Sequence, residues 1–421
     1  MTGGVLGPAV ARARRLTVRA VVTSGLPSAL DRRILRTAFD AAPRDPRRRL
    51  VLPPPGAGNV GDQALVEAVL ENLAGPIALV VGNTGDVQLP PLVRSRVEVL
   101  AAPDLVYGSG AAHRAAVADF GRVLATASEL LVLGADVMDG RYALPASVRR
   151  ATIAAAAAAA GVGTRVVGFS WSADARLAAR RAMTVAGNSG VRLLARDPVS
   201  AVRARSAGLR VTEAADVVFA AHTVDGSAAD ELLHGISAPV ALVNVSGLLA
   251  QRFDQIPDYV AVVDALRARG LHVLLLPHVR RPTGDDVAAC AAVARRVGTD
   301  RVSSVPALLP PAQVRGLAAR TAVTVTGRMH LAVMSLMNGV PALTLASQGK
   351  VEGLMQLVGA PELCLPARPG FAAGAVEVID RSLPADSAVR AAIRAALPTV
   401  TELARRNFDG LALTVPAPAD A

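Results

Sequence analysis

Aromatic residues, cysteine, lysine and long apolar runs are all scarce in this chain of 421 residues. Aromatic residues make up only 3%, too few for the stacking platforms that bind single-stranded nucleic acids. Cys290 and Cys364 lie far apart and match no metal-binding spacing, so we expect a reducing, cytoplasmic location. The alanine-rich run at 154–162 is too short to span a membrane, and residues 1–19 lack the pattern of a secretory signal.

Positive charge is abundant but unevenly distributed. The net charge is +11, and residues 1–50 contain eleven arginines against three aspartates. We predict a basic N-terminal extension over residues 1–48, which is either simply solvated or weakly attracted to an anionic membrane surface. No helix-turn-helix, zinc or aromatic motif supports a nucleic-acid partner. Lys350 is the single lysine among 45 basic residues, which indicates a need for a compact ammonium group rather than a planar guanidinium.

Short apolar runs alternate with helical segments through most of the chain, as in parallel sheets covered by helices. Six strands are expected between residues 50 and 195 and four between 240 and 345, with a polar linker candidate at 223–235. We therefore predict an α/β fold with two Rossmann-like parallel-sheet domains that face a cleft. The predicted parts are domains at 49–228 and 236–385, a C-terminal helix at 386–415 and a disordered tail at 416–421. Chemistry is expected in the loops after the strands, because open parallel sheets bind ligands at that edge.

Two loops of the first domain carry carboxylates. Residues 53–62 contain three glycines and lead into a helix, but match neither a Walker loop nor the dinucleotide-binding glycine pattern. Asp62 is either the N-cap of that helix or a carboxylate that faces the cleft. Asp136 and Asp139 either bind sugar hydroxyls or a metal, or close a turn through their own backbone. No third metal ligand accompanies them, so no metal site is predicted.

Basic and imidazole side chains follow other strands. Arg196 suits a carboxylate or phosphate, with a structural salt bridge as the alternative. Residues 326–330 read Thr-Gly-Arg-Met-His and place Arg328 and His330 where a strand ends and a helix begins. The helix dipole favours an anion there, and histidine can move a proton near neutral pH. His278 is a second cleft candidate, with a buried, hydrogen-bonded histidine as the alternative.

Three segments resemble, in order, the motifs of the polysaccharide pyruvyl transferase family. They lie at residues 59–65, 195–219 and 326–351. The first reads Asn-Val-Gly-Asp-Gln-Ala-Leu and resembles the family's Asn-x-Gly-Asp-x-Ala-Ile/Leu signature. The second begins Ala-Arg-Asp-Pro-Val-Ser and resembles its Arg-Asp/Glu-x-x-Ser block. The third resembles Ser-Gly-Arg-Leu-His, followed by Gly-Val-Pro and Lys-Val.

The resemblance implies a fold like the two-domain GT-B glycosyltransferases and transfer of the enolpyruvyl unit of phosphoenolpyruvate to a saccharide, polymeric or lipid-linked. The product is a pyruvate ketal, and phosphate is released. Phosphoenolpyruvate is then a co-substrate and no cofactor is implied. His330 becomes the candidate general acid, and Asp62 a base or hydroxyl-orienting group. The implied substrate-binding residues are Arg196, Arg328, Asn59, Gly61, Asp139, His278 and Lys350.

Two alternatives stay open at this point. One is a GT-B glycosyltransferase that uses a nucleotide sugar, for which Glu352 is the one obvious acid near the expected ribose. The other is a binding protein that keeps the cleft without catalysis. Many family members have a glycine-rich run where this chain has residues 134–139, so the acceptor sugar is left unspecified.

Overall fold

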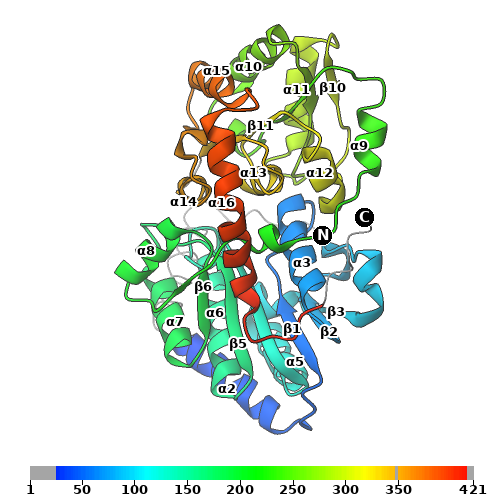
Figure 1. Ribbon diagram of the computed structural model, residues 1–421. Coiled ribbons are helices and arrows are strands. Elements are labelled where there is room, and N and C mark those ends of the chain that lie inside the picture. Colours follow the sequence, from blue (N-terminus) through cyan, green and yellow to red (C-terminus); the bar gives the residue numbers. More distant parts are fainter. Residues whose placement is uncertain (1–24, 347–348, 415–421) are drawn as a thin grey trace, which may run out of the picture.

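Two parallel sheets, one in each half of the chain, organise the computed structural model, which describes residues 25–346 and 349–414 (Figure 1). The first sheet has the order β3-β2-β1-β4-β5-β6-β7 and the second β10-β9-β8-β11-β12-β13. The strands of the first sheet are β1 (Arg48–Leu52), β2 (Ile77–Val81), β3 (Val97–Ala101), β4 (Ala127–Ala135), β5 (Gly163–Phe169), β6 (Arg192–Ala195) and β7 (Thr212–Glu213). Those of the second are β8 (Val240–Asn244), β9 (His272–Leu275), β10 (Val302–Ser304), β11 (Val323–Thr326), β12 (Ala342–Ala346) and β13 (Cys364–Pro366).

Helices cover both faces of each sheet, which explains why inner strands such as β2 are buried along their whole length. The helices of the first half are α2 (Leu26–Asp40), α3 (Val60–Asn72), α4 (Pro103–Val106), α5 (Gly110–Leu124), α6 (Leu144–Ala159), α7 (Leu177–Asn188) and α8 (Pro198–Ser206). Those that follow are α9 (Ser227–Leu232), α10 (Ile256–Ala268), α11 (Asp286–Val297), α12 (Pro311–Ala318), α13 (Met329–Leu336), α14 (Lys350–Leu357), α15 (Phe371–Ser382) and α16 (Ala388–Arg405). None of the helices within the described ranges is long and apolar enough to cross a membrane.

Both sheets reverse their strand order at the first strand, between β1 and β4 and between β8 and β11. Such a reversal opens a crevice at the carboxyl edge of a parallel sheet. The helices that begin at these points are α3 and α13, and they contact each other across the two domains. The two crevices therefore face one another.

The predicted basic extension is wrong for its second half. Helix α2 packs against α5 and α6, with Leu35 and Phe39 buried. Asp31 is also buried and lies 3.2 Å from His113 Nε2. The apolar positions of α2 recur at helical spacing beneath its arginines, so residues 25–48 belong to the first domain. Residues 1–24 and the predicted tail at 416–421 lie outside the described residues.

The chain crosses between the domains twice. The expected linker at 223–235 contains α9, which packs on α12 of the second domain. Helix α16 runs back to the first domain (Figure 1), where Asn407 just beyond it accepts a hydrogen bond from Gly168 N at 3.1 Å. A buried cation joins the domains as well, because Arg315 of α12 lies 3.5 Å from Glu67 and 3.4 Å from Glu71 of α3.

The loop between β1 and α3 is held directly against the second domain. Val60 N donates to His278 O at 3.1 Å, and Arg280 N donates to Gly58 O at 2.8 Å. Gly58 has φ +69°, and a Cβ there would collide with the carbonyl oxygen of Arg280. Glycine is thus required both by the backbone conformation and by the close approach of the two loops.

Candidate active site

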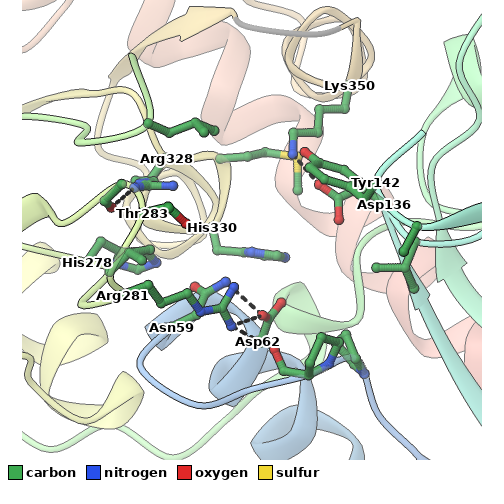
Figure 2. A pocket seen from close by; sticks show the side chains of 18 of the residues that line it. Asn59, Asp62, Asp136, Tyr142, His278, Arg281, Thr283, Arg328, His330 and Lys350 are labelled. Atoms are coloured by element: carbon green, nitrogen blue, oxygen red, sulfur yellow. Dashed lines mark hydrogen bonds and ion pairs between the residues drawn. The ribbon is translucent and has the colours of Figure 1, made fainter. Parts of the chain in front are cut away.

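A cavity of about 640 Å³ lies between the domains, at the carboxyl ends of strands from both sheets (Figure 2). Its lining side chains divide by domain. The carboxylates that line it, Asp62 and Asp136, come from the first domain. The cationic and imidazole side chains that line it come from the second domain and are His278, Arg281, Arg328, His330 and Lys350.

Arg328 lies where β11 ends and α13 begins. Its guanidinium is fixed by Asp286, with Nε 3.1 Å from Oδ2, and by Gly284 O, 3.0 Å from Nη2. Asp286 is fully buried and also accepts hydrogen bonds from backbone N–H groups, including that of Gly247 at 2.9 Å. Arg328 Nη1 makes no hydrogen bond to the described residues, so one edge of an oriented guanidinium is left for a ligand.

His330 lies between the Asp62–Arg281 and Asp136–Lys350 pairs (Figure 2) and rests on a buried carboxylate. Its Nε2 is 3.4 Å from Asp216 Oδ2, which also accepts a hydrogen bond from Arg196 Nη1 at 2.9 Å. Burial alone would raise the pKa of Asp216, but the neighbouring His330 and Arg196 charges outweigh it and hold that pKa at about 2. The buried carboxylate and the Arg196 guanidinium, whose Nη1 lies 3.5 Å from the same ring nitrogen, therefore fix the position of the imidazole.

Arg196 does not line the cavity. It is buried, and its Nε donates to Ser170 Oγ at 2.8 Å while Nη1 engages Asp216. The structural salt bridge is therefore the interpretation that this geometry fits, and the predicted direct contact between Arg196 and a donor anion is wrong. Arg196 instead positions Asp216 beneath His330.

The start of α3 explains why residues 59–62 have their particular sequence. Asn59 is the N-cap, with Oδ1 accepting from Gly61 N at 3.0 Å and Nδ2 donating to Asp62 Oδ2 at 2.7 Å. Asp62 is thus not the N-cap, and it faces the cavity. A Cβ on Gly61 would overlap the ring of His330, so Gly61 acts by allowing close packing and does not itself line the cavity.

Burial raises the pKa of Asp62, and this effect outweighs the opposing charge of Arg281. Arg281 Nη2 lies 3.2 Å from Asp62 Oδ2 and 2.7 Å from Pro55 O, and its Nε donates to Ala57 O at 2.9 Å. Arg281 therefore spans the cleft, again with Nη1 left without a partner among the described residues. A carboxyl group with a raised pKa is suited to taking up a proton.

The second pair across the cleft joins Lys350, the first residue of α14, to Asp136. Burial would raise the pKa of Asp136, but Lys350 and Arg196 hold it well below its usual range. Tyr142 lies beside this pair (Figure 2). The sole lysine of the chain is thus one of the cations of the cavity.

Asp139, by contrast, is not among the residues that line the cavity. Its Oδ1 accepts from Arg141 N at 3.0 Å, and its carbonyl oxygen accepts from Arg176 N at 2.9 Å. The turn at Gly140, which has φ +80°, directs Asp139 into this local network. The predicted role of Asp139 in substrate binding is wrong, and Asp136 is the carboxylate that this loop brings to the cavity.

His278 is buried, with only 1% of its surface exposed, yet it lines the cavity. Neither ring nitrogen has a hydrogen-bond partner within the described part of the chain, which excludes a histidine satisfied by these residues. Burial, together with the charges of His330 and Arg328, lowers the pKa of His278 well below its usual value. The ring is therefore neutral near pH 7, with one donor and one acceptor available.

The sequence interpretation missed three residues of the site. Arg281 could have been found, because the pair Arg280-Arg281 follows the carboxyl end of β9. Asp216 was present in a matched motif without a role, and Asp286 resembles an ordinary residue of a helix start. No group of three or more histidine, cysteine or acidic residues that could hold a metal ion occurs within residues 25–346 and 349–414.

Comparisons with known proteins agree with this architecture. A family model for polysaccharide pyruvyl transferases matches residues 59–349. No curated protein sequence matches the chain.

Several solved structures share the fold at low sequence identity. A Listeria monocytogenes protein described as a UDP-N-acetylglucosamine 2-epimerase has a TM-score of 0.55 at 10% identity, over 86% of this chain and 94% of its own. The epimerase of Methanocaldococcus jannaschii has a TM-score of 0.53 at 9% identity, over 84% and 98%. That of Neisseria meningitidis, solved with UDP-GlcNAc, has a TM-score of 0.53 at 9% identity, over 85% and 97%. With two facing Rossmann-like domains and a family match over most of its length, the chain has a GT-B-like fold and belongs to the polysaccharide pyruvyl transferase family.

Proposed function

We propose that this protein transfers the enolpyruvyl unit of phosphoenolpyruvate to a saccharide and forms a pyruvate ketal with release of phosphate. The observation that carries the proposal is the separation of charge across the cavity. The second domain contributes the cations and imidazoles, and the first contributes the carboxylates. A small, highly anionic donor fits the second-domain wall, and the hydroxyl groups of a sugar fit the first-domain wall.

Donor binding falls to Arg281 and Arg328. Each guanidinium is fixed through Nε and Nη2 and keeps Nη1 without a partner among the described residues. The two pre-oriented Nη1 amino groups can hydrogen-bond the carboxylate and phosphate of the donor with little further loss of side-chain entropy. Neutral His278 supplies a further donor or acceptor to the same ligand.

The reaction needs one acid and one base. In the proposed sequence, His330 protonates the methylene carbon of phosphoenolpyruvate, and a sugar hydroxyl attacks C2 as Asp62 takes up its proton. The C–O bond to phosphate then breaks, and a second hydroxyl closes the ketal. The two sugar hydroxyls release two protons in all. One of them restores the proton that His330 gave to the methylene carbon, and the other leaves with the phosphate. Positive charge from Arg281 and Arg328 stabilises the departing phosphate.

The glycosyltransferase alternative depends on Glu352 as the acid that would contact the ribose of a nucleotide sugar. Glu352 is not among the residues that line the cavity, its side chain is 52% exposed, and it pairs with Arg203 at 3.6 Å. The similar epimerase structures carry no argument about substrate, because their identity to this chain is about 10%.

The test is phosphate release from phosphoenolpyruvate across a panel of saccharide acceptors, with mass spectrometry of the products. We expect acceptor-dependent release and a product heavier by one pyruvate ketal, both lost in His330→Gln. Stabilisation by UDP-sugars with no effect of phosphoenolpyruvate would overturn the proposal.

A further inference from the structure

A second cavity, of about 330 Å³, lies in the first domain beside the cleft. It is formed at the carboxyl ends of β1, β2 and β3, and it shares Pro54, Pro55 and Tyr107 with the interdomain cavity. Much of its wall is apolar, with contributions from Leu52 and Val80. The shared residues make it a side chamber of the candidate active site.

Among the described residues, Arg150 of α6 is the one cation that lines this chamber. It is only 2% exposed, and its Nε and Nη1 have no hydrogen-bond partner within the described ranges. Burial lowers the pKa of the Arg150 guanidinium, and this effect outweighs the opposing influence of Tyr107, at the junction of the two cavities, and of Asp62. Because a buried cation without an anionic partner is costly, a chamber that keeps one is suited to an anion from outside.

Other buried arginines of the protein differ in this respect. Arg196 is paired with Asp216 at 2.9 Å, and Arg315 lies within 3.5 Å of two glutamates. The carboxylate that lines the chamber, Asp86, is occupied locally, since its Oδ2 accepts from Asn83 N at 2.8 Å. Arg150 therefore differs from them as a buried guanidinium that forms no ion pair with the residues that the structure describes.

We infer that the side chamber binds an oxyanion, a carboxylate or a phosphate, carried by the acceptor saccharide. The sugar ring then lies in the interdomain cavity near Asp62, and its anionic substituent passes Tyr107 to reach Arg150. The inference rests on the proposed function in that the bound saccharide is taken to be the acceptor of that reaction. Binding of an anionic sugar can nevertheless be measured without turnover. The expected acceptor is thus an acidic or phosphorylated saccharide.

The experiment compares three probes by isothermal titration: methyl glucoside, methyl glucuronide and glucose 1-phosphate, with phosphoenolpyruvate titrated separately. The variants are Arg150→Met, Arg150→Lys and Tyr107→Phe. The last removes the hydroxyl group of a half-exposed side chain and leaves the buried arginine in place. Arg114→Met, on the exposed face of α5, matches the change in charge at a distance. Circular dichroism identifies any variant that fails to fold.

We expect at least one anionic probe to bind the wild type more tightly than methyl glucoside. Arg150→Met should weaken that probe by about tenfold to a hundredfold, the usual range for a lost charge-assisted hydrogen bond. Arg150→Lys should restore part of the affinity, Tyr107→Phe should weaken it less, and Arg114→Met should leave it unchanged. Glucuronide and phosphate affinities separate the two sources of the anion.

Three results would overturn the inference: no preference for either anionic probe, a preference that survives Arg150→Met, or no binding of either probe. If Arg150→Met does not fold, the inference is overturned when both Arg150→Lys and Tyr107→Phe keep the wild-type preference for the anionic probe over methyl glucoside. Failure of the proposed function would give a different result: the wild type would neither bind phosphoenolpyruvate nor release phosphate from it. The affinity of the folded Arg150 variants for phosphoenolpyruvate should equal that of the wild type.

Discussion

The second-domain wall of the cavity carries Arg281, Arg328 and His330, whereas the first-domain wall carries Asp62 and Asp136. The two walls are built on sheets with the same strand order, apart from the additional edge strand β7 of the first sheet. Their difference is therefore one of side chains on a common scaffold, in which one wall is suited to an anion and the other to hydroxyl groups.

The two walls also complete each other. Arg281 pairs with Asp62 and Lys350 with Asp136 across the cleft, so the cations are held in place before a ligand arrives. An anionic ligand adds to cations that are already oriented, which lowers the entropic cost of binding. If this division holds, changes in the second-domain wall should affect the anionic donor, and changes in the first-domain wall should affect the sugar hydroxyls.

Among the variants that test the two walls, the largest effect is expected for Arg328→Met. Loss of a pre-oriented cation at a departing phosphate should reduce kcat/KM by about 10²–10³ and weaken phosphoenolpyruvate binding measured by titration. Asp136→Asn is the counterpart on the first-domain wall and should not weaken phosphoenolpyruvate binding. Equal loss in both variants would break the division between the walls.

Gly61→Ala tests the contact between the walls. The added methyl group would push the ring of His330 away, and a shift of about 1 Å can cost about 10² in rate. Gly85→Ala is the matched control, because nothing lies within 4 Å of a Cβ there. We expect a normal circular dichroism spectrum for both variants and low turnover for Gly61→Ala alone.

Asp216→Asn should lower stability and change its pH dependence. The pKa of Asp216 in the folded state, about 2, lies below its unfolded value, so its ionised form stabilises the fold above about pH 4. The contribution is on the order of 2 kcal/mol and is lost as pH falls from about 4 towards 2. Urea unfolding of wild type and Asp216→Asn should therefore differ at pH 7 and converge in acid; a constant difference would contradict the assignment.

His278→Asn should alter stability below neutral pH. The folded pKa of His278 is lowered, so the unfolded chain takes up a proton first as pH falls below about 6.5, and wild-type stability decreases. The slope is at most about 1.4 kcal/mol per pH unit for one group. The variant should show a shallower decrease between pH 6.5 and 5 in urea titrations, whereas parallel curves would mean that His278 is not held neutral.

Lys350→Arg should have the smallest effect, a reduction in kcat/KM of about tenfold or less. A guanidinium preserves the charge opposite Asp136 but not the compact ammonium geometry beside Tyr142. Lys350→Met removes the charge too and should be more damaging. An activity in Lys350→Arg equal to that of the wild type would show that any cation is sufficient there.

The sequence was informative where one strand and one helix define a position. The inner strands and the segments carrying Asp62, Arg328 and His330 were predicted, because buried parallel strands are apolar and their ends carry the polar residues. The edge strands β7, β10 and β13, of two or three residues each, were not, since so short a run has no distinct pattern.

The role of a residue could not be predicted from the sequence where it depends on a contact with a residue distant in the chain. Arg196 and Asp139 have the right types and spacing, but their contacts with Asp216 and Arg141 turn them away from the cavity. Arg281 reaches the site only because the two domains face each other. Local pattern thus identified the loops of the site, while the direction of each side chain was set by partners distant in sequence.

The most direct test of the division between the walls is a crystal structure of the protein with phosphoenolpyruvate. The phosphate and carboxylate of the ligand should lie within hydrogen-bond distance of Nη1 of Arg281 and Nη1 of Arg328, with the methylene carbon facing His330. Ligand bound instead on the first-domain wall, away from both guanidinium groups, would contradict the account.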